Sequence, residues 1–190
     1  MKDLNISVVI PNYNGVHLFP ETLPALYTSL ENAGRPYEII IVDDCSTDQS
    51  VEFLRNHFPD IILLINKINL GFSATINKGI FAARNQLVLL LNSDVKLTET
   101  YFSEQFKYFE RPDTFGVMGK IIGWNDNIVQ DGAKYPEMQG FKLKTSLNFV
   151  RMSLTKGFSI KYRYYALLLL RPKNGLRPLN WSEDILRAKL

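Results

Sequence analysis

Polar residues, most of them acids or amides, follow three short apolar runs of this sequence. The runs are SVVI at 7–10, IIIV at 39–42 and LVLLL at 87–91, and the segments that follow them are Pro11-Asn12-Tyr13-Asn14, Asp43-Asp44 and Asn92-Ser93-Asp94. Parallel α/β sheets bind ligands in the crevice beyond the carboxyl ends of their strands. We therefore expect these three segments to meet at one site.

The side chains of these segments suit a nucleotide. An ionised carboxylate only accepts hydrogen bonds, so Asp43 and Asp44 suit the N–H groups of a base or the hydroxyls of a ribose. Tyr13 offers a ring for stacking. Asp94, two residues after Asn92, offers the hard oxygen ligand that Mg²⁺ or Mn²⁺ prefers and shares with phosphate oxygens and water. Together these chemistries predict a site for a nucleoside diphosphate and a divalent cation.

Other nucleotide-binding classes lack support in the sequence. Neither G-x-G-x-x-G nor G-x-x-x-x-G-K-[ST] occurs in it, which argues against a dinucleotide enzyme and a P-loop NTPase. A nucleotidyltransferase would show a glycine- and arginine-rich loop after its first strand, and PNYNG at 11–15 does not provide one.

The pattern of apolar residues predicts an α/β fold with a mostly parallel sheet flanked by helices. Short runs rich in Ile, Val and Leu predict buried strands at 6–10, 38–42, 61–65, 87–91 and 116–122. Helical patterns alternate with these runs, which implies right-handed crossover connections.

Four helices are expected between the strands. Pro20 or Pro24 suits the first turn of the first helix, and Gly34 suits its end. Ser46, Thr47 or Asp48 would cap the second helix, and Ser73 would cap the third, in which Gly79 indicates either close packing or a local weakness. Thr98 would cap a fourth helix with a core stripe of Phe102, Phe106 and Phe109.

Four ordered blocks of the sequence resemble the inverting family 2 glycosyltransferases of the GT-A fold. The blocks are SVVIPNYNG at 7–15, EIIIVDDCSTDQS at 38–50, NLGFSATINKGI at 69–80 and LVLLLNSDV at 87–95. The resemblance covers residues 5–135 and is closest to polysaccharide-building bacterial members of the rhamnosyltransferase-like type. It implies a metal-dependent transfer of a hexosyl or deoxyhexosyl group from a nucleotide sugar to a surface polysaccharide or lipid-linked glycan, with inversion.

The resemblance also assigns roles to residues. Asp44 would bind the base with Asp43 beside it, and Asp94 would bind Mg²⁺ or Mn²⁺ in an N-x-D variant of the family's D-x-D motif. The other residues that the resemblance places around the donor are Pro11, Tyr13, Asn14, Asn69, Gly71, Asn92 and Ser93. Asn77 and Lys78 are read as a solvated helix face.

An inverting transfer needs a general base within reach of the acceptor hydroxyl. By resemblance the candidate is Asp184 in NWSEDILRAKL, whereas Asp131 in QDGAKY is read as structural because a turn signal surrounds it. The family's usual acceptor half is longer than the segment here. A catalytically silent nucleotide-sugar-binding module is therefore the alternative to an active transferase.

Charge divides the chain into two parts. Residues 1–141 hold 11 Lys and Arg against 17 Asp and Glu, a net charge of −6, and residues 142–190 hold 11 against 2, a net charge of +9. We interpret 1–141 as the nucleotide-sugar-binding core and 142–190 as a basic segment on the acceptor side. Its basic residues alternate with aromatic residues and the run at Leu167–Leu170, a composition that suits an anionic membrane surface, whereas the acidic core argues against nucleic acid.

No apolar stretch approaches the roughly 20 residues that span a bilayer, and no signal peptide is recognised at the start. We therefore expect a cytoplasmic protein in peripheral contact with the inner membrane face. Cys45 is the single cysteine, so an intramolecular disulfide is excluded. The sugar, the base, the acceptor and the oligomeric state stay open.

Overall fold

A computed structural model describes residues 4–103, 105–110, 114, 116–119 and 121–123, together with the backbone of strands at 129–131, 136–139, 142–145 and 166–170. Its largest sheet has six strands, of which four are parallel and adjacent, in the order β3-β2-β1-β4 with β3 at the edge. They are β1 (Ile6–Asn12), β2 (Tyr37–Asp43), β3 (Ile62–Ile65) and β4 (Leu87–Leu91). The predicted α/β class and the first four predicted strands are confirmed.

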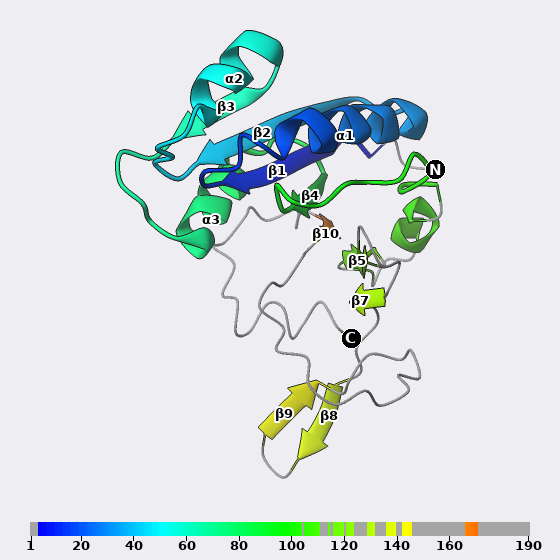
Figure 1. Cartoon of the computed structure of the whole chain (residues 1–190). Helices are drawn as coiled ribbons and strands as arrows, with labels where there is room; N and C mark the ends of the chain where they lie inside the picture. The colour runs from blue at the N-terminus through cyan, green and yellow to red at the C-terminus, as the bar shows by residue number, and fades with distance from the viewer. Residues whose placement is uncertain are drawn as a thin grey trace.

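Helices cover both faces of this sheet (Figure 1). Side chains alternate between the two faces of a strand, so Val8 and Ile10 pack with α1 (Phe19–Ala33) and α2 (Ser50–His57), while Val9 packs with α3 (Phe72–Ala82). Two apolar cores result, and the sheet lies between them as the middle layer.

The first helix has the ends that the sequence predicts. Pro20 is its second residue, where a missing N–H removes no helical hydrogen bond. Gly34 ends it in the left-handed conformation, with φ 61° and ψ 30°, and its N–H donates to Glu31 O at 3.0 Å.

Helix starts differ in part from the prediction. The second helix begins at Ser50 after Gln49, which provides no side-chain cap, but the N–H of Ser50 donates to Asp48 Oδ1 at 3.0 Å, so Asp48 serves the first turn as one of the three predicted caps. The third helix begins at Phe72 after Gly71, so Ser73 does not cap it. The predicted fourth helix is reduced to the 3₁₀ segment η1 (Phe106–Glu110). The stretch before it, TETYF at 98–102, is rich in β-branched and aromatic residues, which lose side-chain freedom in a helix.

The aromatic stripe is nevertheless part of the core. Phe102 is fully buried and stacks on Phe106 with 5.7 Å between the ring centroids. Phe106 and Phe109 are partly buried against the same cluster.

The predicted strand at 116–122 is divided in two. β5 (Gly116–Met118) pairs antiparallel with β10 (Ala166–Leu170), which also pairs antiparallel with β4. β6 (Ile121–Ile122) instead pairs with β7 (Val129–Asp131), and β8 (Pro136–Gln139) pairs with β9 (Lys142–Thr145). The Leu167–Leu170 run is therefore a strand of the main sheet, which corrects its placement on a membrane surface and joins these residues of the 142–190 segment to the core.

Gly79 lies where α3 packs closely on the sheet, which decides between the two interpretations of this glycine in favour of close packing. A Cβ atom at this position would overlap the side chain of Val9 and lie 3.1 Å from Val42 Cγ2. Both valines are fully buried and β-branched, so neither side chain can turn aside.

We expect Gly79→Ala to lower the free energy of unfolding by roughly 1–2 kcal/mol, because overpacking costs more than the gain in helix propensity. Denaturant unfolding measures this difference. Ser73→Ala, at an exposed position of the same helix, is the matched control and should change stability by less than about 0.5 kcal/mol. An unchanged midpoint for Gly79→Ala would contradict this account of the packing.

Candidate functional site

The ends of β1 and β2 meet, as the sequence predicts. Asn12 and Asp43 are opposite one another in the parallel register. Asn12 Nδ2 donates to Asp43 Oδ1 at 2.8 Å, and the Asp43 side chain is buried, with 1% of the residue exposed. A buried carboxylate requires hydrogen-bond donors, and the neighbouring loops supply them.

Ser46 joins the loops that follow these two strands. Its Oγ donates to Asp43 Oδ1 at 2.6 Å, and its backbone N–H donates to Asp43 Oδ2 at 2.9 Å. The same Oγ accepts the backbone N–H of Asn14 at 2.9 Å. Asp43 therefore acts inside the protein as the centre of a hydrogen-bonded corner.

Asn14 ties the first loop to the second from the other side. Its Oδ1 accepts the backbone N–H of Thr47 at 2.8 Å and that of Asp48 at 3.3 Å. Its backbone is left-handed, with φ 54°, a conformation that asparagine tolerates better than most residues. The structure gives Asn14 a role in loop geometry, and its predicted contact with a donor stays a prediction.

Asp44 is buried as well, with 4% exposed, and it holds the loop that follows β3. Its Oδ1 accepts Asn66 Nδ2 at 2.8 Å and the N–H of Leu70 at 2.9 Å, and its Oδ2 accepts the N–H of Gly71 at 2.8 Å. Burial by itself raises the pKa of Asp44, but these hydrogen bonds and one from Thr75 outweigh it and leave the pKa below its usual value. Asp44 is therefore an anion at neutral pH.

Gly71 completes this loop. Its φ of 79° and ψ of 167° belong to a region that is essentially restricted to glycine. The Gly71 N–H is shared between Asp44 and the Oδ1 of Asn69, at 3.0 Å from the latter. The structure thus brings together Asp44, Asn69 and Gly71, three of the predicted site residues.

Asp94 has a different environment from the other two acids. Its Oδ1 is buried, and no hydrogen bond to it is found within the described part of the chain. Burial raises the pKa of Asp94 above its usual value, and a hydrogen bond from its own backbone opposes the rise only in part. Asp94 Oδ1, a buried carboxylate oxygen without a described donor, is a candidate ligand for a cation.

The loop after β1 lies against the loop after β4. A Cβ atom at Gly15 would overlap Asn12 Oδ1 and lie 3.6 Å from Ser93 Oγ. A side chain at position 15 would therefore collide with Asn12 at the start of its own loop, whereas the distance to Ser93 is an ordinary contact between the two loops. The segment that contains Asn92, Ser93 and Asp94 lies beside the corner formed by Asn12 and Asp43.

The residues present fit a hard divalent cation. Among the described residues no group of three His, Cys, Asp or Glu side chains is placed to hold a metal ion. Mg²⁺ and Mn²⁺ do not need one, because protein sites commonly give them one or two carboxylates and leave the other positions to phosphate oxygens and water. Asp94 would supply the carboxylate here.

The first loop also presents the predicted stacking surface. Tyr13 is 54% exposed, so its ring is accessible for stacking. Pro11 is buried in β1, opposite Val42 of β2.

The prediction missed Ser46, Asn66 and Lys78. Asn66 directly follows the third apolar run, so the rule applied to the other three strands would have found it. Lys78 was expected on a solvated helix face, but its Nζ donates to Asn66 Oδ1 at 2.7 Å and to Ile65 O at 3.1 Å. The helical pattern could not show how closely α3 approaches the end of β3.

Two further predicted residues are not tested by this geometry. Asp184 lies outside the described residues. Asp131 is the last residue of β7, and the structure describes only its backbone.

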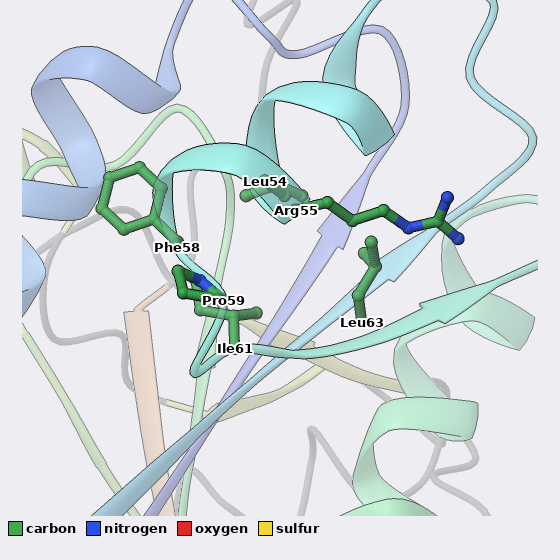
Figure 2. Close-up of a pocket in the computed structure, with 6 residues that line it drawn as sticks. All are labelled: Leu54, Arg55, Phe58, Pro59, Ile61 and Leu63. Atoms are coloured by element: carbon green, nitrogen blue, oxygen red, sulfur yellow. The ribbon is translucent and has the colours of Figure 1, made fainter.

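A small pocket lies away from this site (Figure 2). It has a volume of about 140 Å³ and is formed by residues around the end of α2 and the start of β3: Leu54, Arg55, Phe58, Pro59, Ile61 and Leu63. It lies at the amino end of β3, opposite the polar loops, and is smaller than the roughly 300–1,000 Å³ of ligand pockets. We assign no chemistry to it.

Solved structures share this fold. TarS of S. aureus (residues 1–349) matches 71% of this chain and 42% of its own, with a TM-score of 0.58 and 23% identity. The mannosyltransferase PcManGT from Pyrobaculum calidifontis, solved in complex with GDP-Man and Mn²⁺, matches 64% of this chain and 36% of its own, with a TM-score of 0.54 and 21% identity. The predicted GT-A fold is confirmed.

Several named proteins are similar to this chain in sequence. The amylovoran biosynthesis glycosyltransferase AmsB of Erwinia amylovora is 31% identical over 138 residues, 70% of this chain and 45% of that protein. Undecaprenyl-phosphate 4-deoxy-4-formamido-L-arabinose transferase of Pectobacterium carotovorum subsp. carotovorum (strain PC1) is 35% identical over 97 residues, 48% of this chain and 29% of that protein. The chain thus spans less than half the length of these relatives.

The match to a family extends over most of the chain. The model of glycosyl transferase family 2 aligns with residues 7–171, which include every described residue of the polar site. The chain therefore belongs to glycosyl transferase family 2.

Proposed function

We propose that this chain provides the donor site of an enzyme that transfers a sugar from a nucleotide-diphosphate sugar to a glycan or lipid-linked acceptor, with inversion at the anomeric carbon. The observation that carries the proposal is the Asp94 carboxylate, whose buried Oδ1 has no described partner at the end of β4. Burial of this carboxylate without a donor costs free energy, and a cation bound together with a diphosphate would offset that cost.

The other residues would hold the donor around this point. The exposed Tyr13 ring would stack on the base, and Asp44 with the loop at 69–71 would face the nucleoside. A divalent cation, when bound by Asp94, would stabilise the charge that develops on the departing diphosphate. Asp43 accepts hydrogen bonds from Asn12 and Ser46 within the protein. We therefore propose that it holds the surrounding loops in position and does not contact the donor itself.

The relatives support a nucleotide-sugar donor and a glycan or lipid-linked acceptor. TarS has been solved with UDP-GlcNAc and PcManGT with GDP-Man, so members of this fold take different bases and hexoses. The relatives named above belong to amylovoran biosynthesis and to transfer onto undecaprenyl phosphate. We propose a hexosyl or deoxyhexosyl donor and an acceptor in bacterial surface polysaccharide assembly.

The general base and the location complete the proposal. We keep Asp184 as the candidate base for the acceptor hydroxyl and the basic residues of 142–190 as a contact with the inner membrane face. In the part of the chain that the structure describes, no helix has the length and apolar character required to cross a bilayer.

Nucleotide titration tests the donor site. We expect calorimetry with a panel of nucleoside diphosphates to find one that binds in the presence of Mn²⁺, and Asp94→Ala to weaken this binding at least tenfold, since it removes the carboxylate ligand. Lys96→Met, an exposed change on the following segment, should leave affinity unchanged. Absence of binding by the folded wild-type protein would refute the proposal, and binding without sugar transfer would favour the silent module.

We expect Asp94→Asn and Asp44→Asn to change the unfolding temperature in opposite directions. Since the pKa of Asp94 is raised on folding, its charge destabilises the fold as pH rises through that pKa. In a chelating buffer at pH 7, Asp94→Asn should therefore raise the unfolding temperature. Asp44→Asn should lower it, because the stability provided by a lowered pKa is present at neutral pH and is lost on acidification.

Thermal unfolding from pH 7 downward measures both effects. The gain from Asp94→Asn should diminish as the wild-type carboxyl becomes protonated. A lower unfolding temperature for Asp94→Asn at pH 7 would show that Asp94 is satisfied within the protein, contrary to the proposed role.

The loop at 69–71 can be tested through glycine. Gly71→Ala meets no atom within 4 Å, so its effect reports backbone strain, which costs about 1–3 kcal/mol in this region. We expect it to weaken both folding and nucleotide binding. Gly34→Ala, strained by its φ of 61° at the other end of the sheet, should destabilise the protein and leave nucleotide affinity unchanged. Equal affinity for wild type and Gly71→Ala would separate this loop from the donor site.

A further inference from the structure

We infer that Lys78 is a positioning residue for nucleotide recognition, because its ammonium fixes the orientation of the Asn66 amide that holds Asp44. The inference rests on the proposed donor site and adds a residue to it. Lys78 lies in the middle of α3, and its side chain extends to the end of β3.

Lys78 makes two short contacts there. Its Nζ donates to Asn66 Oδ1 at 2.7 Å and to Ile65 O at 3.1 Å. An ammonium has three donors, so two of the three are used within the protein. This arrangement differs from that of a lysine whose charge faces a bound phosphate.

These contacts determine the orientation of the Asn66 amide. Ammonium groups only donate, so the atom that faces Lys78 must be the carbonyl oxygen. The amide nitrogen then faces Asp44 Oδ1 at 2.8 Å and Thr75 Oγ1 at 3.2 Å, one acceptor for each of its two N–H groups. A reversed amide would place nitrogen against the ammonium and oxygen against the Asp44 carboxylate, which is unfavourable at both ends.

Asn66 is itself fixed by the strand. It is buried, and its backbone N–H donates to Asp43 O at 2.8 Å, which continues the pairing of β3 with β2. The amide can therefore respond to the loss of Lys78 mainly by rotation. Rotation would remove one of the donors that hold Asp44, the same carboxylate that positions the N–H groups of Leu70 and Gly71.

Lys78→Met tests the inference, since methionine keeps the length of the stem and removes all three donors. We expect the dissociation constant of the nucleoside diphosphate to rise roughly tenfold, the loss typical of a hydrogen bond to a charged group. The nucleoside monophosphate should lose affinity by the same factor, with and without Mn²⁺, because the network faces the nucleoside and not the diphosphate. Lys67→Met, an exposed charge removal on the same loop, is the matched control and should leave both constants unchanged.

A double-mutant cycle separates positioning from a general structural effect. On an Asp44→Asn background, Lys78→Met should weaken binding by no more than about threefold, because residues of one hydrogen-bond network are not additive. Asn66→Asp, which keeps Lys78 and sets a second carboxylate against Asp44, should reproduce the loss. If Lys78→Met does not fold, the nucleotide affinity of Asn66→Asp tests the inference in its place.

The outcomes distinguish the inference from the function on which it rests. No nucleotide binding by the wild type overturns both. If the wild type binds, then unchanged affinity in Lys78→Met, an equal loss in Lys67→Met, fully additive cycles or a loss confined to the diphosphate would each overturn the inference alone, the last because it would place Lys78 on the phosphates.

Discussion

Two buried carboxylates at the end of β2 organise the polar half of this protein. Asp43 and Asp44 are adjacent in sequence, and neither is more than 4% exposed. Their desolvation has to be offset by donors. Asp43 takes them from the last residue of β1 and from the loop after β2, and Asp44 takes them from the loop after β3. One pair of acids therefore sets the positions of three loops, and the sheet beneath sets the positions of the acids.

The environment of Asp94 is the opposite of that of Asp44. Asp44 receives more donors than most carboxylates and has a lowered pKa, whereas the buried Oδ1 of Asp94 has no donor among the described residues and the pKa of Asp94 is raised. The first arrangement stabilises the fold, and the second leaves a buried carboxylate oxygen without a described donor beyond the end of β4, which is separated from β2 by β1. Proteins commonly accept such a cost where a ligand completes the site.

How much was predictable depends on the range of the interactions. β1 to β4 are apolar runs whose length and composition identify buried strands, and the rule on strand ends located the polar segments at once. β10 could not be placed from the sequence, because an apolar run such as Leu167–Leu170 fits a membrane surface as well as a sheet. Its position is determined by pairing with β4, which is distant in sequence. Lys78 was misread for the same reason: its helix was predicted correctly, but its partner Asn66 depends on how α3 lies across the sheet.

The pairing of β10 between β4 and β5 has a consequence for the order of assembly. The parallel part of the sheet needs only residues up to Leu91, whereas the far side of β4 has no described partner strand until residues 166–170 have been made. Contacts of such sequence separation form slowly. A nascent chain or one shortened before this point would thus expose the unpaired edge of a buried, all-apolar strand, the kind of edge that promotes association between chains.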